Sequence, residues 1–96
     1  MQLAARFASI AACAGARYPA AAMLETLTQT AAACADAASA EQSPETKQLL
    51  TNLQTAVTTW HQVWPRLGAQ REFRLAVARE AKLWSKRLSE AEHAAS

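Results

Sequence analysis

The sequence predicts an all-α fold, a small antiparallel bundle of three or four helices built from two helical hairpins. Half of the 96 residues are hydrophobic, and about half of those are alanine, the best helix former. The chain has only two glycines and three prolines, fewer turn residues than a strand-rich domain of this length needs. Larger apolar residues recur every three or four positions, which is the period of a helix with one buried face.

The same periodicity divides the chain into four segments within one domain that spans 1–96, a length that leaves no room for a second domain. We expect helices at about 2–16, 19–38, 44–64 and 69–93, with a linker at about 39–43. Gly15 and the Tyr18–Pro19 step end the first helix, because a residue before proline is pushed out of helical geometry. Pro19 then suits the first position of the second helix.

The third helix has the clearest start and the most continuous apolar stripe. Ser43 is a good N-cap, Pro44 fits the first helical position, and Glu45 suits the positive end of the helix dipole. The stripe consists of Leu49, Leu50, Leu53, Ala56, Val57, Trp60, Val63 and Trp64. Pro65 and Gly68 are expected to interrupt this helix.

Trp60 and Trp64 lie one turn apart and project to the same side of the third helix. If the third and fourth helices form a hairpin that turns near 65–69, Val57 lies opposite Val77 and Trp60 lies beside Phe73. We expect the two indoles to close the turning end of this hairpin. Trp64 lies closest to the turn, so projection toward a partner stays open for this residue.

The polar side of the third helix carries threonine and glutamine where solvated helices usually carry glutamate and lysine. Thr51, Thr55 and Thr58 are its central members. A charge-poor face is typical of the centre of a protein interface. A solvated face without charges is the other interpretation, and both stay open.

The last helix carries a basic stripe. Winding it at about 100° per residue places Arg71, Arg79, Lys82 and Lys86 within a sector of about 80°, with Leu75 in the middle. Three interpretations compete: a solvated charged face, a contact for an acidic or amphipathic partner helix, and a surface that binds a phosphate backbone. The net charge of +2 is too small to indicate a nucleic-acid partner by itself.

The residue types that carry catalysis are few and scattered. Cys13 and Cys34 lie too far apart in the expected hairpin for a disulfide, and neither shares metal-ligand spacing with His61 or His93. We therefore predict that the protein is not an enzyme and holds no metal or cofactor. Two unpaired thiols favour a reducing compartment, so we expect a cytoplasmic location.

The first 16 residues have some features of a targeting segment: one arginine, a short apolar stretch and no acidic residue. We interpret them instead as an uncleaved first helix of the bundle. No apolar run approaches the ~18 residues that a transmembrane helix requires.

These observations favour a non-catalytic interaction module, such as a small adaptor, an export chaperone or an accessory subunit. It would offer helical faces to a protein partner, which can be a second copy of itself. The candidate contact residues are Arg71, Leu75, Arg79, Lys82, Lys86, Thr51, Thr55, Thr58 and Trp64. The alternative is a nucleic-acid-associated protein that uses the basic stripe of the last helix.

Overall fold

The computed structural model describes residues 3–16 and 19–95, and within them the chain is helical without strands. The helices are α1 (Leu3–Gly15), α2 (Ala20–Ala40), α3 (Pro44–Leu67) and α4 (Arg71–Ala95). The predicted class, a small all-α bundle, is confirmed.

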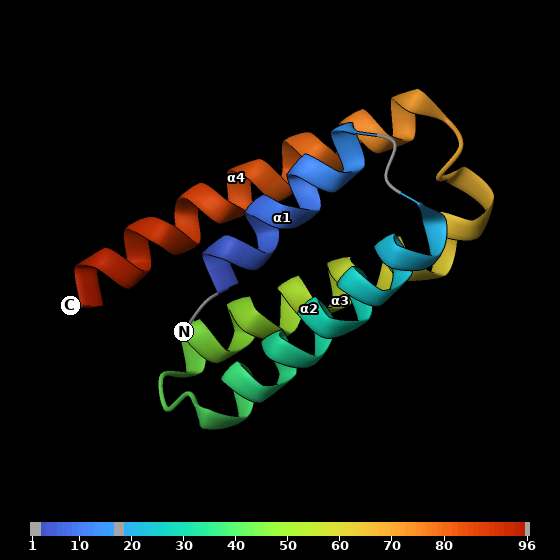
Figure 1. Ribbon diagram of the computed structural model, residues 1–96. Coiled ribbons are helices and arrows are strands. Elements are labelled where there is room, and N and C mark those ends of the chain that lie inside the picture. Colours follow the sequence, from blue (N-terminus) through green and yellow to red (C-terminus); the bar gives the residue numbers. More distant parts are fainter. Residues whose placement is uncertain (1–2, 17–18, 96) are drawn as a thin grey trace.

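The four helices form two layers of two helices each (Figure 1). In one layer α1 packs closely against α4, and in the other α2 packs closely against α3. Each helix runs opposite to the one before it, so neighbours in the chain are antiparallel (Figure 1). One hydrophobic core lies between the layers and draws on every helix, including Phe7, Leu27, Leu53 and Val77.

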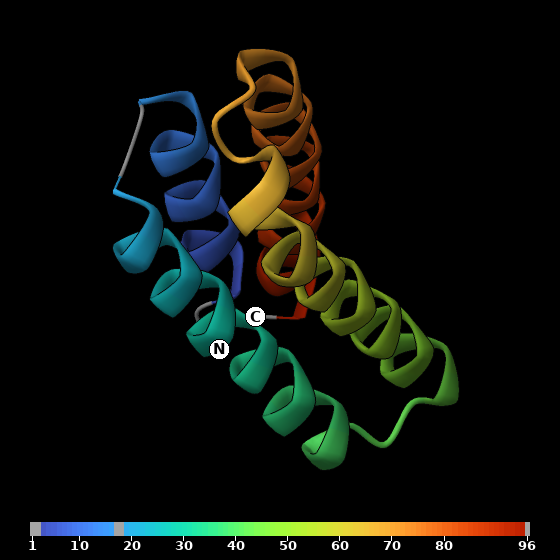
Figure 2. The ribbon, with the colours of Figure 1, turned by 90° about the vertical axis from the view of Figure 1, so that its right-hand side faces the viewer.

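The pairing of α3 with α4 differs from the expectation. The two helices meet at their connecting turn and then diverge, so they do not form a closely packed hairpin along their length (Figure 2). The expected partners Val57 and Val77 are both buried, but α4 makes its close backbone approach to α1 instead.

Small side chains explain why α1 and α4 come so close together. α1 turns Ala4 and Ala11 toward the core, and α4 contributes Ala78 and Ala81. Helices can approach closely where both carry small residues. One hydrogen bond joins the pair directly, since the Ser85 hydroxyl donates to the carbonyl of Ala4 at 2.8 Å.

The helix ends follow the expected signals with two differences. The Ser43 side chain accepts a hydrogen bond from the backbone N–H of Thr46, which confirms the predicted N-cap. Pro19 is the N-cap of α2 and not its first helical residue. Pro65 does not end α3, which continues to Leu67. A proline near the end of a helix removes only one hydrogen bond there, and the Gly68 N–H still donates to the Trp64 carbonyl at 2.8 Å.

The turn between α3 and α4 is held by an aromatic contact and an arginine. Trp64 packs edge-on against Phe73, with ring centroids 5.4 Å apart, so the ring beside Phe73 is Trp64 where Trp60 was expected. The Arg74 guanidinium donates to the carbonyls of Gly68 and Ala69, both at 3.0 Å. These contacts fix the direction in which α4 leaves the turn.

Candidate partner-binding surfaces

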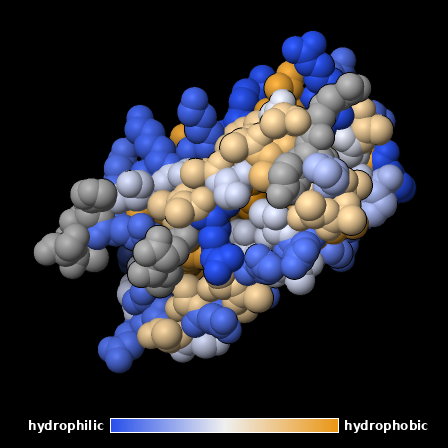
Figure 3. Space-filling model, in the orientation of Figure 1, coloured by the Kyte–Doolittle hydropathy of each residue, from blue (hydrophilic) through white to orange (hydrophobic). Residues whose placement is uncertain are grey.

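The predicted basic stripe lies on the outside of α4. We call it the basic face, and its residues are Arg71, Leu75, Arg79, Lys82 and Lys86, all of them exposed. The predicted phase of α4 is correct, because Leu75 is 41% exposed whereas Val77 and Ala81 are buried. Figure 3 shows hydrophilic residues along the upper edge of the molecule, where α4 lies, above a band of more hydrophobic residues over α1.

A second exposed leucine on α4 was missed. Leu83 is 47% exposed, and with Leu75 it forms the pair of large hydrophobic side chains that lie open to solvent in the described part of the chain. The helical period could have found it, since Leu83 lies about 40° beyond Arg79 and away from the apolar stripe. Leu83 thus borders the basic face on the side of α4 away from α1, whereas Leu75 lies within the face.

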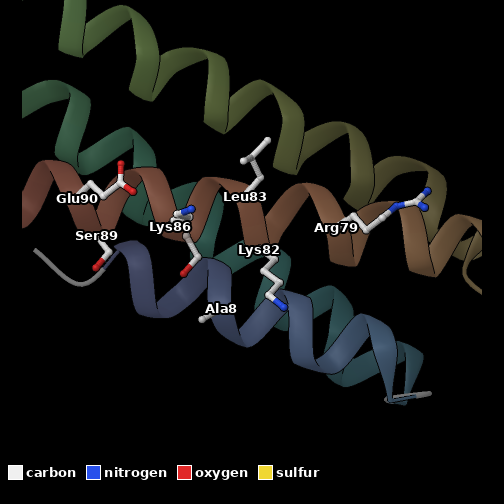
Figure 4. Close-up of a pocket in the computed structure, with 8 residues that line it drawn as sticks. Ala8, Arg79, Lys82, Leu83, Lys86, Ser89 and Glu90 are labelled. Carbon is white, nitrogen blue, oxygen red and sulfur yellow. The ribbon is translucent and has the colours of Figure 1, made fainter.

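Two shallow hollows lie where α1 and α4 meet the surface. Ala8 of α1 forms one with Arg79, Lys82, Leu83 and Lys86 of α4, and Ser85, Ser89 and Glu90 complete its lining. In Figure 4, Lys82 extends over α1, whereas Leu83 points to the other side of α4. The second hollow is lined by Ala14, Gly15, Ala69, Arg71, Arg74 and Leu75. Small residues on α1 keep both hollows open beside the cations.

The cations of the basic face are not neutralised by carboxylates within the described residues, where no ion pair involves Arg71, Arg79, Lys82 or Lys86. The neighbouring Arg87 lies over the ring of Trp84, 5.2 Å from its centroid, so this guanidinium is directed to the aromatic ring. The cations of the basic face are thus not held in ion pairs, although the carboxylate of Glu90 lines the same hollow as Lys86.

The outward side of α3 is the second candidate surface. We call it the neutral face, and its residues are Gln48, Thr51, Asn52, Thr55, Thr58, Thr59 and Gln62, all of them exposed. The hydroxyls of Thr51, Thr55 and Thr59 each donate to the carbonyl four residues earlier, at 2.9, 3.1 and 2.9 Å. Since these hydroxyls bond within their own helix, the threonine methyl groups are left to face outward. A shallow hollow in this face is lined by Gln54, Thr55, Thr58, Thr59 and Gln62.

Trp64 does not belong to either surface. It is 4% exposed and Trp60 is 7% exposed, so both indoles are core residues. The predicted contact role of Trp64 therefore has no exposed surface to act through, because the side chain turns inward against Phe73. The other predicted contact residues fall into two groups. The outward face of α3 holds Thr51, Thr55 and Thr58, and the outward face of α4 holds Arg71, Arg79, Lys82 and Lys86.

The thiols are separate, and the described residues hold no group of three or more His, Cys, Asp or Glu side chains that could bind a metal ion. Cys13 is half-buried and Cys34 is fully buried. Burial raises the pKa of the Cys34 thiol to about 11, and Arg6 offsets this in part. A thiol with this pKa is a poor nucleophile near neutral pH.

No family model, no curated protein and no solved structure matches the chain. None of the helices, as far as the structure describes them, is both long enough and apolar enough to cross a bilayer. The two surfaces therefore have to be interpreted from their own chemistry.

Proposed function

We propose that the protein is a non-catalytic interaction module, of the adaptor, export-chaperone or accessory-subunit kind, that binds an acidic amphipathic helix along the basic face of α4. The observation that carries the proposal is the position of the two exposed leucines. Leu75 and Leu83 both lie on α4, and each lines a hollow together with exposed cations.

Charge complementarity determines the chemistry of the partner. Four exposed cations lie between 71 and 86, a length of about 22 Å along the helix axis. A partner with carboxylates at the same spacing would gain an ion pair at each end and in the middle of the contact. Complementary charge of this kind speeds association and selects the partner.

The leucines determine the shape of the partner. They are about 12 Å apart along α4 and about 80° apart around it, so a partner helix has to cross α4 at an angle to contact both. An amphipathic helix with apolar side chains seven or eight positions apart can place one of them on each leucine, as in other helix-in-groove contacts. The small side chains of Ala8 and Gly15 leave room beside α4 for such a helix.

The experiment is a fluorescence anisotropy titration with a labelled helical peptide of about 20 residues. The peptide carries glutamates on one side and leucines at positions i and i+7, and a scrambled peptide of equal composition is the reference. We expect binding at micromolar concentrations, with a loss of at least tenfold in affinity for Lys82→Glu/Lys86→Glu. Leu75→Ala/Leu83→Ala should also weaken binding by about tenfold, because apolar anchors dominate such contacts.

Lys47→Glu is the matched control, because Lys47 is an exposed lysine on α3 away from the basic face. It should leave the affinity almost unchanged. Equal binding of the scrambled peptide, or no binding at 100 µM peptide, would contradict the proposal.

Duplex DNA in place of the peptide distinguishes the alternative function. Binding to a phosphate backbone weakens steeply as salt rises from ~50 to 200 mM and does not depend on the leucines. Tight binding of DNA that Leu75→Ala/Leu83→Ala leaves intact would replace the helix-binding proposal with a nucleic-acid one.

We also propose a cytoplasmic location. The support is the pair of free thiols, one of them fully buried, which suits a reducing compartment.

A further inference from the structure

We infer that the neutral face of α3 pairs with the same face of a second copy of this chain, with the two α3 helices antiparallel across a two-fold axis at Thr55. This surface lies on a different helix from the basic face. The inference is therefore independent of the proposed function.

The register of the neutral face favours this pairing. In an antiparallel pair centred on Thr55, facing positions add up to 110. Thr51 then lies opposite Thr59 of the second copy, Asn52 opposite Thr58, and Gln48 opposite Gln62. Each exposed residue of the face thus meets an uncharged polar residue, and no charge is enclosed.

The charges at the two ends of α3 complement each other in the same register. Glu45 lies in the first turn of α3 and Arg66 lies in the last turn. Their positions add up to 111, one residue from direct opposition, so each end of the pair brings Glu45 of one copy within reach of Arg66 of the other. Lys47 projects from the opposite edge of the helix, about 100° from Arg66, and lies level with Val63 of the second copy in this register.

A second copy is the occupant that the charge pattern favours. In a two-fold contact a surface meets itself, so a charged patch would repel its own copy. The basic face of α4 is excluded from such a contact for this reason, whereas the neutral face has no Asp, Glu, Lys or Arg from Gln48 to Gln62.

The threonines give the contact its shape. Because Thr51, Thr55 and Thr59 direct their hydroxyls to their own backbone, they present a row of methyl groups one turn apart. Two such rows can interlock across the axis, and the hollow at Thr58 and Thr59 receives side chains of the second copy. Glutamine side chains at the edges can then exchange hydrogen bonds.

The contact should be weak. The neutral face offers seven residues, whereas a standard interface uses about 20 to 30 residues on each side. We therefore expect a dissociation constant of roughly 0.1–1 mM, with monomers at about 10 µM.

The test is sedimentation equilibrium of the whole chain between about 10 µM and 1 mM, with four variants. Thr55→Arg places two like charges against each other on the axis and should abolish dimers. Thr28→Arg is the matched control, because Thr28 is also exposed and also donates to the carbonyl four residues earlier, in α2. It should dimerise like the unchanged chain.

Charge exchange tests the antiparallel register. Glu45→Arg should weaken the dimer at least threefold, and Glu45→Arg/Arg66→Glu should restore it. A chain that stays monomeric at 1 mM would overturn the inference. So would a dimer that Thr55→Arg leaves intact, because the contact would then use another surface. Thermal melts of Thr55→Arg and Thr28→Arg should match the unchanged chain, since both residues are exposed. The substitutions at Glu45 and Arg66 reverse favourable charges at the ends of the α3 dipole and should lower the melting temperature slightly.

Discussion

The indole of Trp64 occupies the space that a side chain at position 68 would need. A Cβ placed on Gly68 would lie 2.6 Å from Nε1 of Trp64 and 2.7 Å from its carbonyl oxygen. Gly68 has φ of −62°, an ordinary helical value, so backbone conformation does not require glycine here. Glycine is required because Trp64 lies so close to this position. The contact lies at the C-terminal end of α3.

Gly68→Ala should therefore destabilise the protein by about 1–3 kcal/mol, the usual cost of forcing extra atoms into a packed site. The measurement is the free energy of unfolding in urea. Gly15→Ala is the control, because no atom lies within 4 Å of a Cβ at Gly15. Equal effects of the two substitutions would mean that the indole does not occupy this position.

Truncation of a core leucine and of an exposed leucine should give opposite results. Leu53 is 1% exposed, so Leu53→Ala should cost about 2–5 kcal/mol, a large part of the stability of a domain this small. Trp60→Ala should cost about 3–5 kcal/mol for the same reason. Leu75→Ala should leave the melting temperature almost unchanged. A large fall for Leu75→Ala would show that the helical phase of α4 is wrong.

The Ser85 hydroxyl ties α4 to α1. Ser85→Ala removes its hydrogen bond to the Ala4 carbonyl and should cost about 1 kcal/mol. Urea unfolding measures this loss. Ser39→Ala, at an exposed serine near the end of α2, should change stability much less. Identical unfolding curves for Ser85→Ala and the unchanged chain would mean that this hydrogen bond does not stabilise the folded state.

The buried thiol of Cys34 should make the protein sensitive to alkaline pH. Its pKa is raised from 9.0 to about 11, mainly by burial, so the folded state holds the thiol proton more tightly than the unfolded state does. This contribution to stability is complete below pH 9 and is lost as pH rises from about 9 to about 11.

From pH 8 to pH 10.5, the free energy of unfolding should fall by about 2 kcal/mol more in the unchanged chain than in Cys34→Ala. Urea unfolding of both proteins with a reducing agent measures the difference. Parallel losses in the two proteins would show that Cys34 ionises as easily in the folded state as in the unfolded state.

The spacing of apolar residues was sufficient to predict the four helices and their buried faces. Ser43 was predicted as an N-cap and is one, and Leu75 was predicted on the outside of α4 and lies there. Both predictions depend on the chain within one helix, where geometry repeats every 3.6 residues. Local patterns of this kind are strong signals.

The choice of neighbouring helix could not be predicted in the same way. Periodicity shows which face of a helix is buried but does not show which helix covers it. α3 and α4 were expected to pair because a short turn joins them. The structure pairs α4 with α1, where alanines allow the two backbones to approach, and leaves α3 and α4 close together only near their turn. The extension of α3 past Pro65 was missed because a proline in the last turn costs little.

The candidate surfaces were predicted in part. The cations and Leu75 of the basic face follow from the helical period of α4, but the two hollows beside them depend on α1 lying next to α4. Trp64 was counted among the contact residues because it lies near a turn. Its burial depends on the position of Phe73, which only the packing of the turn determines.

The central claim is that an acidic helix binds on α4 beside α1, and amide chemical shifts test it most directly. ¹⁵N-labelled protein is titrated with the glutamate-rich helical peptide and followed residue by residue. We predict that the largest shifts fall on 71–89 of α4 and on the adjoining residues of α1, while 48–62 of α3 stay unchanged. Shifts concentrated on α3, or spread evenly over the bundle, would contradict the claim.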